Sequence, residues 1–155
     1  MRTIEFIIIH CTATPVTVTL ESMKAYWKNV LGWKNPGYHY LILPSGEIQT
    51  VTSEQNIANG VAGHNRYSIH LAYVGGIDEK GKALDNRTDA QKQAMYAKLL
   101  ELAGRYPDAT IRGHRDFSPD TNHNGVIEPF EWIKGCPAFD VTTWLENYDP
   151  ISKAA

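Results

Sequence analysis

Short apolar runs separated by polar turns predict several β-strands in this chain. The run Ile4 to His10 is continuous and rich in β-branched residues, which is typical of a strand buried on both faces of a sheet. On either side of the turn at 44–46, the segments 38–43 and 47–51 have the composition of a β-hairpin. Two further short strands are expected, at 68–74 and 110–112.

Three other segments carry apolar residues at helical spacing. The first helix is expected within 18–33, with Thr19 as its N-cap. The second is expected at 88–105, where the first residue is again a threonine that can cap it. Asp140 can cap a third, C-terminal helix. Strands and helices mix without regular βαβ alternation, so the pattern predicts an α/β fold with a mixed central β-sheet flanked by helices.

The size and composition are those of one globular domain. The chain has 155 residues, and 43% of them are hydrophobic, which is enough for a buried core. A formal net charge of −2 does not favour nucleic-acid binding, because such proteins usually carry a strong basic excess. No stretch could span a membrane, and the N-terminal apolar run is too short and too acidic for a signal peptide. We therefore expect residues 1–155 to form a single domain that is cytoplasmic when made.

Two of the six histidines stand where strands end. His10 closes the first apolar run, and His114 follows the expected strand 110–112 by two residues. Open sheets commonly place ligands and catalytic groups at strand ends. Cys136, between a glycine and a proline, could converge with them. Two imidazoles and a thiolate that leave a fourth position for water are the pattern of a catalytic zinc site. The alternative is a buried cysteine with two hydrogen-bonded histidines.

The alternation of side chains along strands predicts where their neighbours point. If His10 faces a metal, Cys11 should face the other way and pack as a small hydrophobic residue. By the same rule, Tyr38 and His39 are expected on opposite faces of their strand. His70, inside another expected strand, is expected to be structural.

The segment 120–131 matches the pattern of a calcium-binding loop, with a glycine at the sharp turn. The positions that supply oxygen ligands in such loops are Asp120, Asn122, Asn124, Val126 and Glu131. Few of these residues are charged and a proline interrupts the loop, so an Asn/Gly-rich turn is the alternative. The sequence predicts a calcium loop inserted into another fold. Our hypothesis is that calcium stiffens this loop and so positions the residues that follow it.

Five motifs in order carry a resemblance to a known family: IIIHCTATP, NPGYHYLILPSGEIQT, VAGHNRYSIHLAYVGGID, IRGHRDFSP and KGCPAFDV. Together they resemble the zinc-dependent N-acetylmuramoyl-L-alanine amidases of type 2. That family includes small phage lysozyme-type amidases and the peptidoglycan recognition proteins. The resemblance covers most of the chain, from Ile4 to about Trp144, and the combination of motifs is more specific than any one of them.

The resemblance implies a role for several residues by matching position. His10, His114 and Cys136 stand where the family places its three Zn²⁺ ligands. Tyr38 matches an active-site tyrosine, and Lys134 matches a lysine that phage-type members place beside the metal. A cleft segment that could touch the glycopeptide is matched by His64 and Asn65.

The implied activity is hydrolysis of the amide between N-acetylmuramic acid and L-alanine in bacterial peptidoglycan. A small amidase of this kind fits a phage or prophage endolysin that acts on the cell wall after release. The resemblance also implies a monomer, which is the default for lytic enzymes of this kind. Three alternatives stay open: a non-catalytic peptidoglycan-binding module, a regulatory protein that binds a cytosolic partner, and a Cys-His hydrolase with Cys136 as nucleophile.

Overall fold

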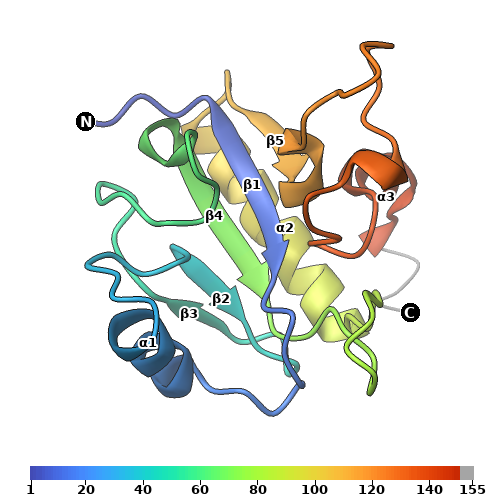
Figure 1. Cartoon of the computed structure of the whole chain (residues 1–155). Coiled ribbons are helices and arrows are strands. Elements are labelled where there is room, and N and C mark those ends of the chain that lie inside the picture. Colours follow the sequence, from blue (N-terminus) through green and yellow to red (C-terminus); the bar gives the residue numbers. More distant parts are fainter. Residues whose placement is uncertain (151–155) are drawn as a thin grey trace.

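The computed structural model describes residues 1–150, and the last five residues of the predicted domain, 151–155, lie outside the described residues. Five strands form one sheet in the order β3-β2-β4-β1-β5 (Figure 1). The strands are Phe6–Cys11 (β1), Tyr40–Ile42 (β2), Ile48–Thr50 (β3), Ser68–Tyr73 (β4) and Thr110–Gly113 (β5). β1 is parallel to β4 and β5, β2 is parallel to β4, and only β3 runs antiparallel to its neighbour. The predicted mixed sheet is confirmed.

Within residues 1–150, three α-helices begin after the predicted caps. They are α1 (Leu20–Asn29), α2 (Asp89–Arg105) and α3 (Val141–Asn147). The side chains of Thr19, Thr88 and Asp140 each accept a hydrogen bond from a backbone N–H in the first turn of the helix that follows. Such a cap contributes about 1 kcal/mol, because it satisfies an N–H that the helix itself cannot.

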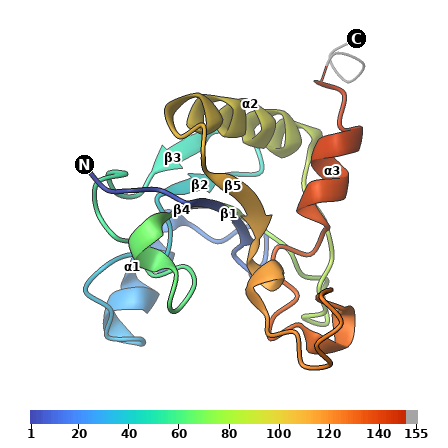
Figure 2. The ribbon, with the colours of Figure 1, turned by 90° about the horizontal axis from the view of Figure 1, so that it is seen from above.

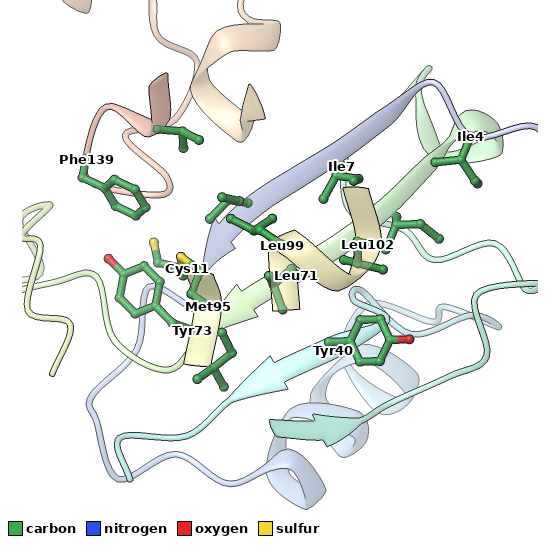
Figure 3. Packing of buried hydrophobic residues seen from close by; sticks show 14 residues of the cluster. Ile4, Ile7, Cys11, Tyr40, Leu71, Tyr73, Met95, Leu99, Leu102 and Phe139 are labelled. Atoms are coloured by element: carbon green, nitrogen blue, oxygen red, sulfur yellow. The ribbon is translucent and has the colours of Figure 1, made fainter. Parts of the chain in front are cut away.

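Helices cover both faces of the sheet, α1 on one side and α2 on the other (Figure 2). On the α1 side, Met23 and Trp27 pack against apolar residues of β2 and β4. On the α2 side, Met95, Leu99 and Leu102 pack against the alternate residues of the same strands in the larger core cluster (Figure 3). This double cover explains why the β1 run is continuously apolar rather than alternating.

The hairpin is shorter than the sequence pattern predicts. β2 begins at Tyr40, so residues 38 and 39 lie before the strand rather than in it. Residues 114–140, between β5 and α3, contain two 3₁₀ turns, His114–Phe117 and Pro129–Glu131, and are otherwise irregular. Among residues 1–150, each helix is too short or too polar to cross a membrane.

Candidate metal centre and its cleft

Three potential metal ligands arrive from distant parts of the chain. β1 and β5 are paired in parallel, with Ile9 opposite Gly113, so the next residues along the two strands are His10 and His114. The carboxyl ends of parallel strands meet at one edge of a sheet, which brings the two imidazoles together. The loop before α3 then returns Cys136 to the same edge.

The donor atoms of these three side chains converge. One ligand atom from each of His10, His114 and Cys136 lies within 4.8 Å of the other two. The His10 Nδ1 to Cys136 Sγ distance is 3.8 Å, and the two imidazole centroids are 4.9 Å apart. Within residues 1–150, no other three histidine, cysteine, aspartate or glutamate side chains converge in this way. Two imidazole nitrogens and a sulfur suit zinc rather than a hard cation such as Mg²⁺.

Backbone contacts hold the cysteine in place. The Cys11 N–H donates to Cys136 Sγ at 3.2 Å, and the Arg115 N–H donates to the Cys136 carbonyl at 2.9 Å. The Tyr73 hydroxyl donates to the next carbonyl, that of Pro137, at 2.7 Å. The Cys11 side chain packs in the core cluster on the α2 side, as strand alternation predicts.

Burial sets the protonation of the cluster. Burial, together with the charge on Lys134, lowers the pKa of His114 to about 4. Burial, with smaller contributions from neighbouring histidines, holds the pKa of His10 well below its usual range. Both rings are therefore neutral at physiological pH, which is the form that binds a metal. Burial also raises the pKa of the Cys136 thiol, so a bound cation is needed to bring it to the thiolate form.

Tyr38 and Lys134 face the same small cavity as the cluster. This cavity, of about 140 Å³, is lined by both residues and by all three potential ligands. The Tyr38 ring centroid lies 5.2 Å from that of His10, and its hydroxyl donates to the Cys11 carbonyl at 3.4 Å. Burial raises the pKa of Tyr38, so the hydroxyl keeps its proton. Lys134 is exposed at the rim.

The prediction that Tyr38 and His39 point to opposite faces is wrong. Both residues precede β2, so the alternation of a strand does not apply to them. Tyr38 lies against His10, whereas the His39 ring stacks on that of His70, with centroids 5.8 Å apart and an interplanar angle of 11°. The His70 ring in turn lies 5.1 Å from that of His10. Both rings are therefore on the side of the sheet that carries the cluster.

Two larger cavities adjoin the small one and extend it into a cleft. One, of about 550 Å³, lies on the His114 side and is lined by residues 59–62 and Phe117. The other, of about 560 Å³, lies on the Tyr38 side and is lined partly by α1. Trp33 and Lys134 line all three cavities. The cluster thus sits on the floor of a cleft, between two lobes.

The two predicted substrate contacts differ in their surroundings. Asn65 lines the lobe on the His114 side, and its Oδ1 accepts a hydrogen bond from the Val61 N–H at 2.8 Å. His64 lies outside the residues that line the cleft. Its ring packs against Phe117 and Phe6, with centroid distances of 4.6 and 5.9 Å. Loop composition alone could not show that His64 and Asn65 point in different directions. The difference arises because a 3₁₀ turn begins at Asn65, directly after His64.

His70 touches the cluster, although the sequence pattern predicted only a structural role for it. Its Nδ1 lies 2.9 Å from His10 Nε2. A signal for this contact was present in the sequence, since alternation along two neighbouring strands can place both residues on one face. The missing information was the register, which pairs Ile8 with His70.

The loop 120–131 is organised by hydrogen bonds within the loop. Glu131 Oε1 accepts from the N–H groups of Thr121 and Asn122 and from the Thr121 hydroxyl, and its Oε2 accepts from the Glu128 N–H. Asp120 accepts from two further N–H groups of the loop, and each predicted asparagine ligand accepts one. The glycine at the turn has a φ of +84°, as the pattern requires. Calcium binding here stays a prediction.

A mixed sheet whose strand ends carry two histidines, with a cysteine brought to them by a loop, offers a donor set that suits a metal-dependent hydrolase. Residues 1–125 match the model of the N-acetylmuramoyl-L-alanine amidase family, and the chain therefore belongs to that family. This confirms the resemblance found in the sequence motifs.

Individual relatives agree with this assignment. The chain is 46% identical over 107 residues to an uncharacterised protein of Haemophilus influenzae, and this match covers 69% of this chain and 92% of the relative. It is 31% identical over 147 residues to the endolysin of Klebsiella phage KP32, covering 94% and 88% of the two chains. A solved structure, the Ph2119 endolysin from a Thermus scotoductus MAT2119 bacteriophage, has the same fold with a TM-score of 0.71 at 24% identity. That match covers 100% of this chain and 87% of the other.

Proposed function

We propose that this protein is a zinc-dependent amidase of the endolysin type. It hydrolyses the amide between N-acetylmuramic acid and L-alanine in peptidoglycan, and it reaches the cell wall after release from the cell in which it is made. The observation that carries the proposal is the convergence of His10, His114 and Cys136 on the floor of the cleft. Family membership and the endolysin relatives support it.

The donor set fits zinc in a catalytic rather than a structural site. Three protein donors leave a fourth tetrahedral position open, and here that position would face the cleft. His10, His114 and Cys136 would hold the ion, which would supply Lewis-acid chemistry toward water and the scissile carbonyl.

Tyr38 and Lys134 are the donors that the chain itself presents to the reacting amide. Hydrolysis develops negative charge on the carbonyl oxygen, and the protonated Tyr38 hydroxyl can donate a hydrogen bond to it. The ammonium of Lys134 places a positive charge at the same cavity. The amine that leaves must take up a proton, and Tyr38 and Lys134, which line the cavity, are groups that can donate one.

The shape of the cleft suits a substrate with two bulky halves. The scissile amide of peptidoglycan joins a sugar to a peptide, so both sides of the reacting bond need room. The lobes of about 550 and 560 Å³ flank the cluster and provide that room. Asn65, in the lobe on the His114 side, is proposed to contact the substrate.

The thiol-nucleophile alternative is less well supported. Cys136 Sγ and His10 Nδ1 lie within 3.8 Å, as a Cys-His pair requires. Nucleophilic cysteines, however, sit in surroundings that lower the thiol pKa. Burial raises the pKa of Cys136, which disfavours a free thiolate nucleophile.

Metal content and amide cleavage, measured on the wild type and on Cys136→Ala, test the proposal. We expect about one zinc per chain in the wild type, and new L-alanine amino termini released from purified sacculi, with both lost in the variant. Zinc without cleavage would favour a binding module. Cleavage without zinc would refute the metal centre and favour the thiol nucleophile.

Calcium in the loop 120–131 is a separate part of this proposal. Asp120 and Glu131 are the charged residues of the predicted ligand set. The internal hydrogen bonds of Glu131 already order the loop, so calcium would add to this order rather than create it.

A further inference from the structure

His10 turns its two ring nitrogens toward different partners. Its Nδ1 faces the cluster, 3.8 Å from Cys136 Sγ. Its Nε2 faces away from the cluster and lies 2.9 Å from His70 Nδ1. Both histidines are buried, with exposed fractions of 1% and 0%, so bulk water does not reach this contact.

The direction of this hydrogen bond follows from metal binding. A neutral imidazole that binds a metal through Nδ1 carries its single proton on Nε2. That N–H of His10 must donate, and the acceptor in contact is His70 Nδ1. His70 therefore holds its own proton on Nε2.

The outer nitrogen of His70 has an unusual position. His70 Nε2 is buried and has no hydrogen-bond partner among the described residues. A buried polar group left without a partner costs about 1–3 kcal/mol. Few such groups occur in native proteins, and each calls for an explanation. Among residues 1–150, the contact with His10 Nε2 is the only side-chain hydrogen bond of His70, so the polar contact of this buried ring is directed at His10.

The His70 ring is itself held in place. The backbone N–H of His70 donates to His39 Nδ1 at 2.9 Å, and His39 Nε2 lies 2.9 Å from the Asn56 carbonyl. His39 also stacks on the His70 ring. On the other side Gly60 leaves no spare room, because a Cβ there would lie 2.2 Å from His70 Nδ1. The acceptor nitrogen is thus fixed at one location.

We propose that His70 is a positioning residue for the metal centre: its Nδ1 accepts the proton of His10 Nε2 and fixes the tautomer and ring orientation in which His10 Nδ1 faces the metal. Metal-binding histidines usually donate their second N–H to a carboxylate, a backbone carbonyl or water. In this chain a second imidazole takes that place, braced by His39. The inference rests on the zinc centre proposed above and adds a residue outside the ligand set.

Two variants of nearly the same size separate positioning from packing. His70→Leu fills the site without an acceptor, and His70→Asn offers an amide oxygen near the position of Nδ1. Zinc affinity is measured by competition with a chelator. We expect His70→Leu to bind zinc about 10–100-fold more weakly than the wild type, as is typical when an outer hydrogen-bond partner of a ligand is removed. We expect His70→Asn to retain most of the affinity.

Thermal unfolding of the metal-free variants reports the structural cost separately. A purely structural role for His70 would lower this stability without making zinc affinity depend on an acceptor. Zinc affinity in His70→Leu equal to that of the wild type would overturn the proposal. So would an equal loss of affinity in both variants.

A measurement on the unaltered protein covers the case in which a variant does not fold. In ¹⁵N-labelled, zinc-loaded protein we expect the proton on His10 Nε2, a bare His70 Nδ1, and a scalar coupling between these two nitrogens across the hydrogen bond. A proton on His70 Nδ1 would overturn the inference while leaving the zinc centre intact. A wild type that binds no zinc would instead refute the zinc centre, and this inference with it.

Discussion

The strand-end cluster and the loop 120–131 both carry side chains of types that can bind metals, yet the fold treats them differently. The predicted ligands of the loop lie close together in sequence, and their oxygens already accept hydrogen bonds from N–H groups of the same loop. The cluster draws on residues 10, 114 and 136, and its donor atoms meet on the floor of a cleft. The loop fits a sequence pattern, whereas the cluster is assembled by tertiary structure.

The difference shows what makes a metal site available. A donor atom can bind an ion when it has a lone pair that accepts no hydrogen bond and when other donor atoms lie within a few ångströms. In the cluster, burial keeps the imidazoles neutral, and outer contacts such as that to His70 orient a ligand ring. In the loop, Glu131 is a hub for backbone N–H groups, so its main role is to hold the loop together.

Replacing one histidine in each region is expected to give the largest difference in zinc content and cleavage rate. His114→Ala removes a member of the cluster, and we expect it to lose zinc. We also expect its cleavage rate to fall by more than the ~10²–10³-fold that loss of a single electrostatic donor costs. The matched control, His123→Ala in the exposed loop, is expected to keep both. Zinc per chain and release of L-alanine amino termini are the readouts. Stoichiometric zinc in His114→Ala would contradict the three-ligand centre.

Removing one hydroxyl from the cluster cavity tests chemistry without removing a ligand. Tyr38→Phe is expected to lower kcat by about 10²–10³-fold, because a hydrogen bond to the developing oxyanion is lost, while zinc affinity stays unchanged. Tyr67, which is exposed outside the cleft, offers the control Tyr67→Phe. Steady-state kinetics on soluble muropeptides can separate kcat from KM. An unchanged kcat would exclude a catalytic role for Tyr38.

The loop should respond to loss of its hub more in stability than in chemistry. Glu131→Gln removes the charge that the loop N–H groups bind, and we expect a lower Tm and faster proteolysis within 120–131. Glu128→Gln, whose side chain binds only two asparagine amides, is the control. Equal Tm values for the two variants would argue against the hub.

The pH dependence of the same carboxylate has a defined sign. Accepting the Glu128 N–H and other loop donors lowers the pKa of Glu131 below its ordinary value of 4.5. A depressed folded pKa means that the stabilisation is present above about pH 4.5 and is lost as pH falls through the lower folded value. Acid titration of Tm should therefore show less loss below pH 4.5 in Glu131→Gln than in the wild type. Parallel titration curves would show that Glu131 contributes nothing.

Calcium is expected to have the smallest effect. If the sequence prediction holds, calcium but not magnesium raises the Tm of the zinc-loaded protein by mass action, and Asp120→Asn reduces the rise. The predicted site has few charged ligands and should therefore bind calcium weakly, so millimolar calcium is the appropriate concentration range. No change in Tm or in amidase rate on adding calcium to chelated, zinc-reconstituted protein would remove calcium from the proposal.

Much of the fold follows from local sequence. The three helix caps, the continuous apolar run of β1 and the mixed sheet were all predictable, because capping and hydrophobic periodicity act over a few residues. The start of β2 was not. The apolar pattern continues through Tyr38 and His39, but these residues turn toward the cluster before the strand begins, so alternation gave the wrong faces.

The sequence by itself singled out His10, His114 and Cys136 as candidate zinc ligands, because the order of the motifs marks these three among all the histidines and cysteines. The tertiary structure alone decided that His70 is their neighbour and that Glu131 is turned into its own loop. The physical reason is the sequence separation of the residues that interact. Caps and apolar periods are set by residues a few positions apart, whereas the contact between residues 10 and 70 depends on the register of two strands and on the space left by Gly60.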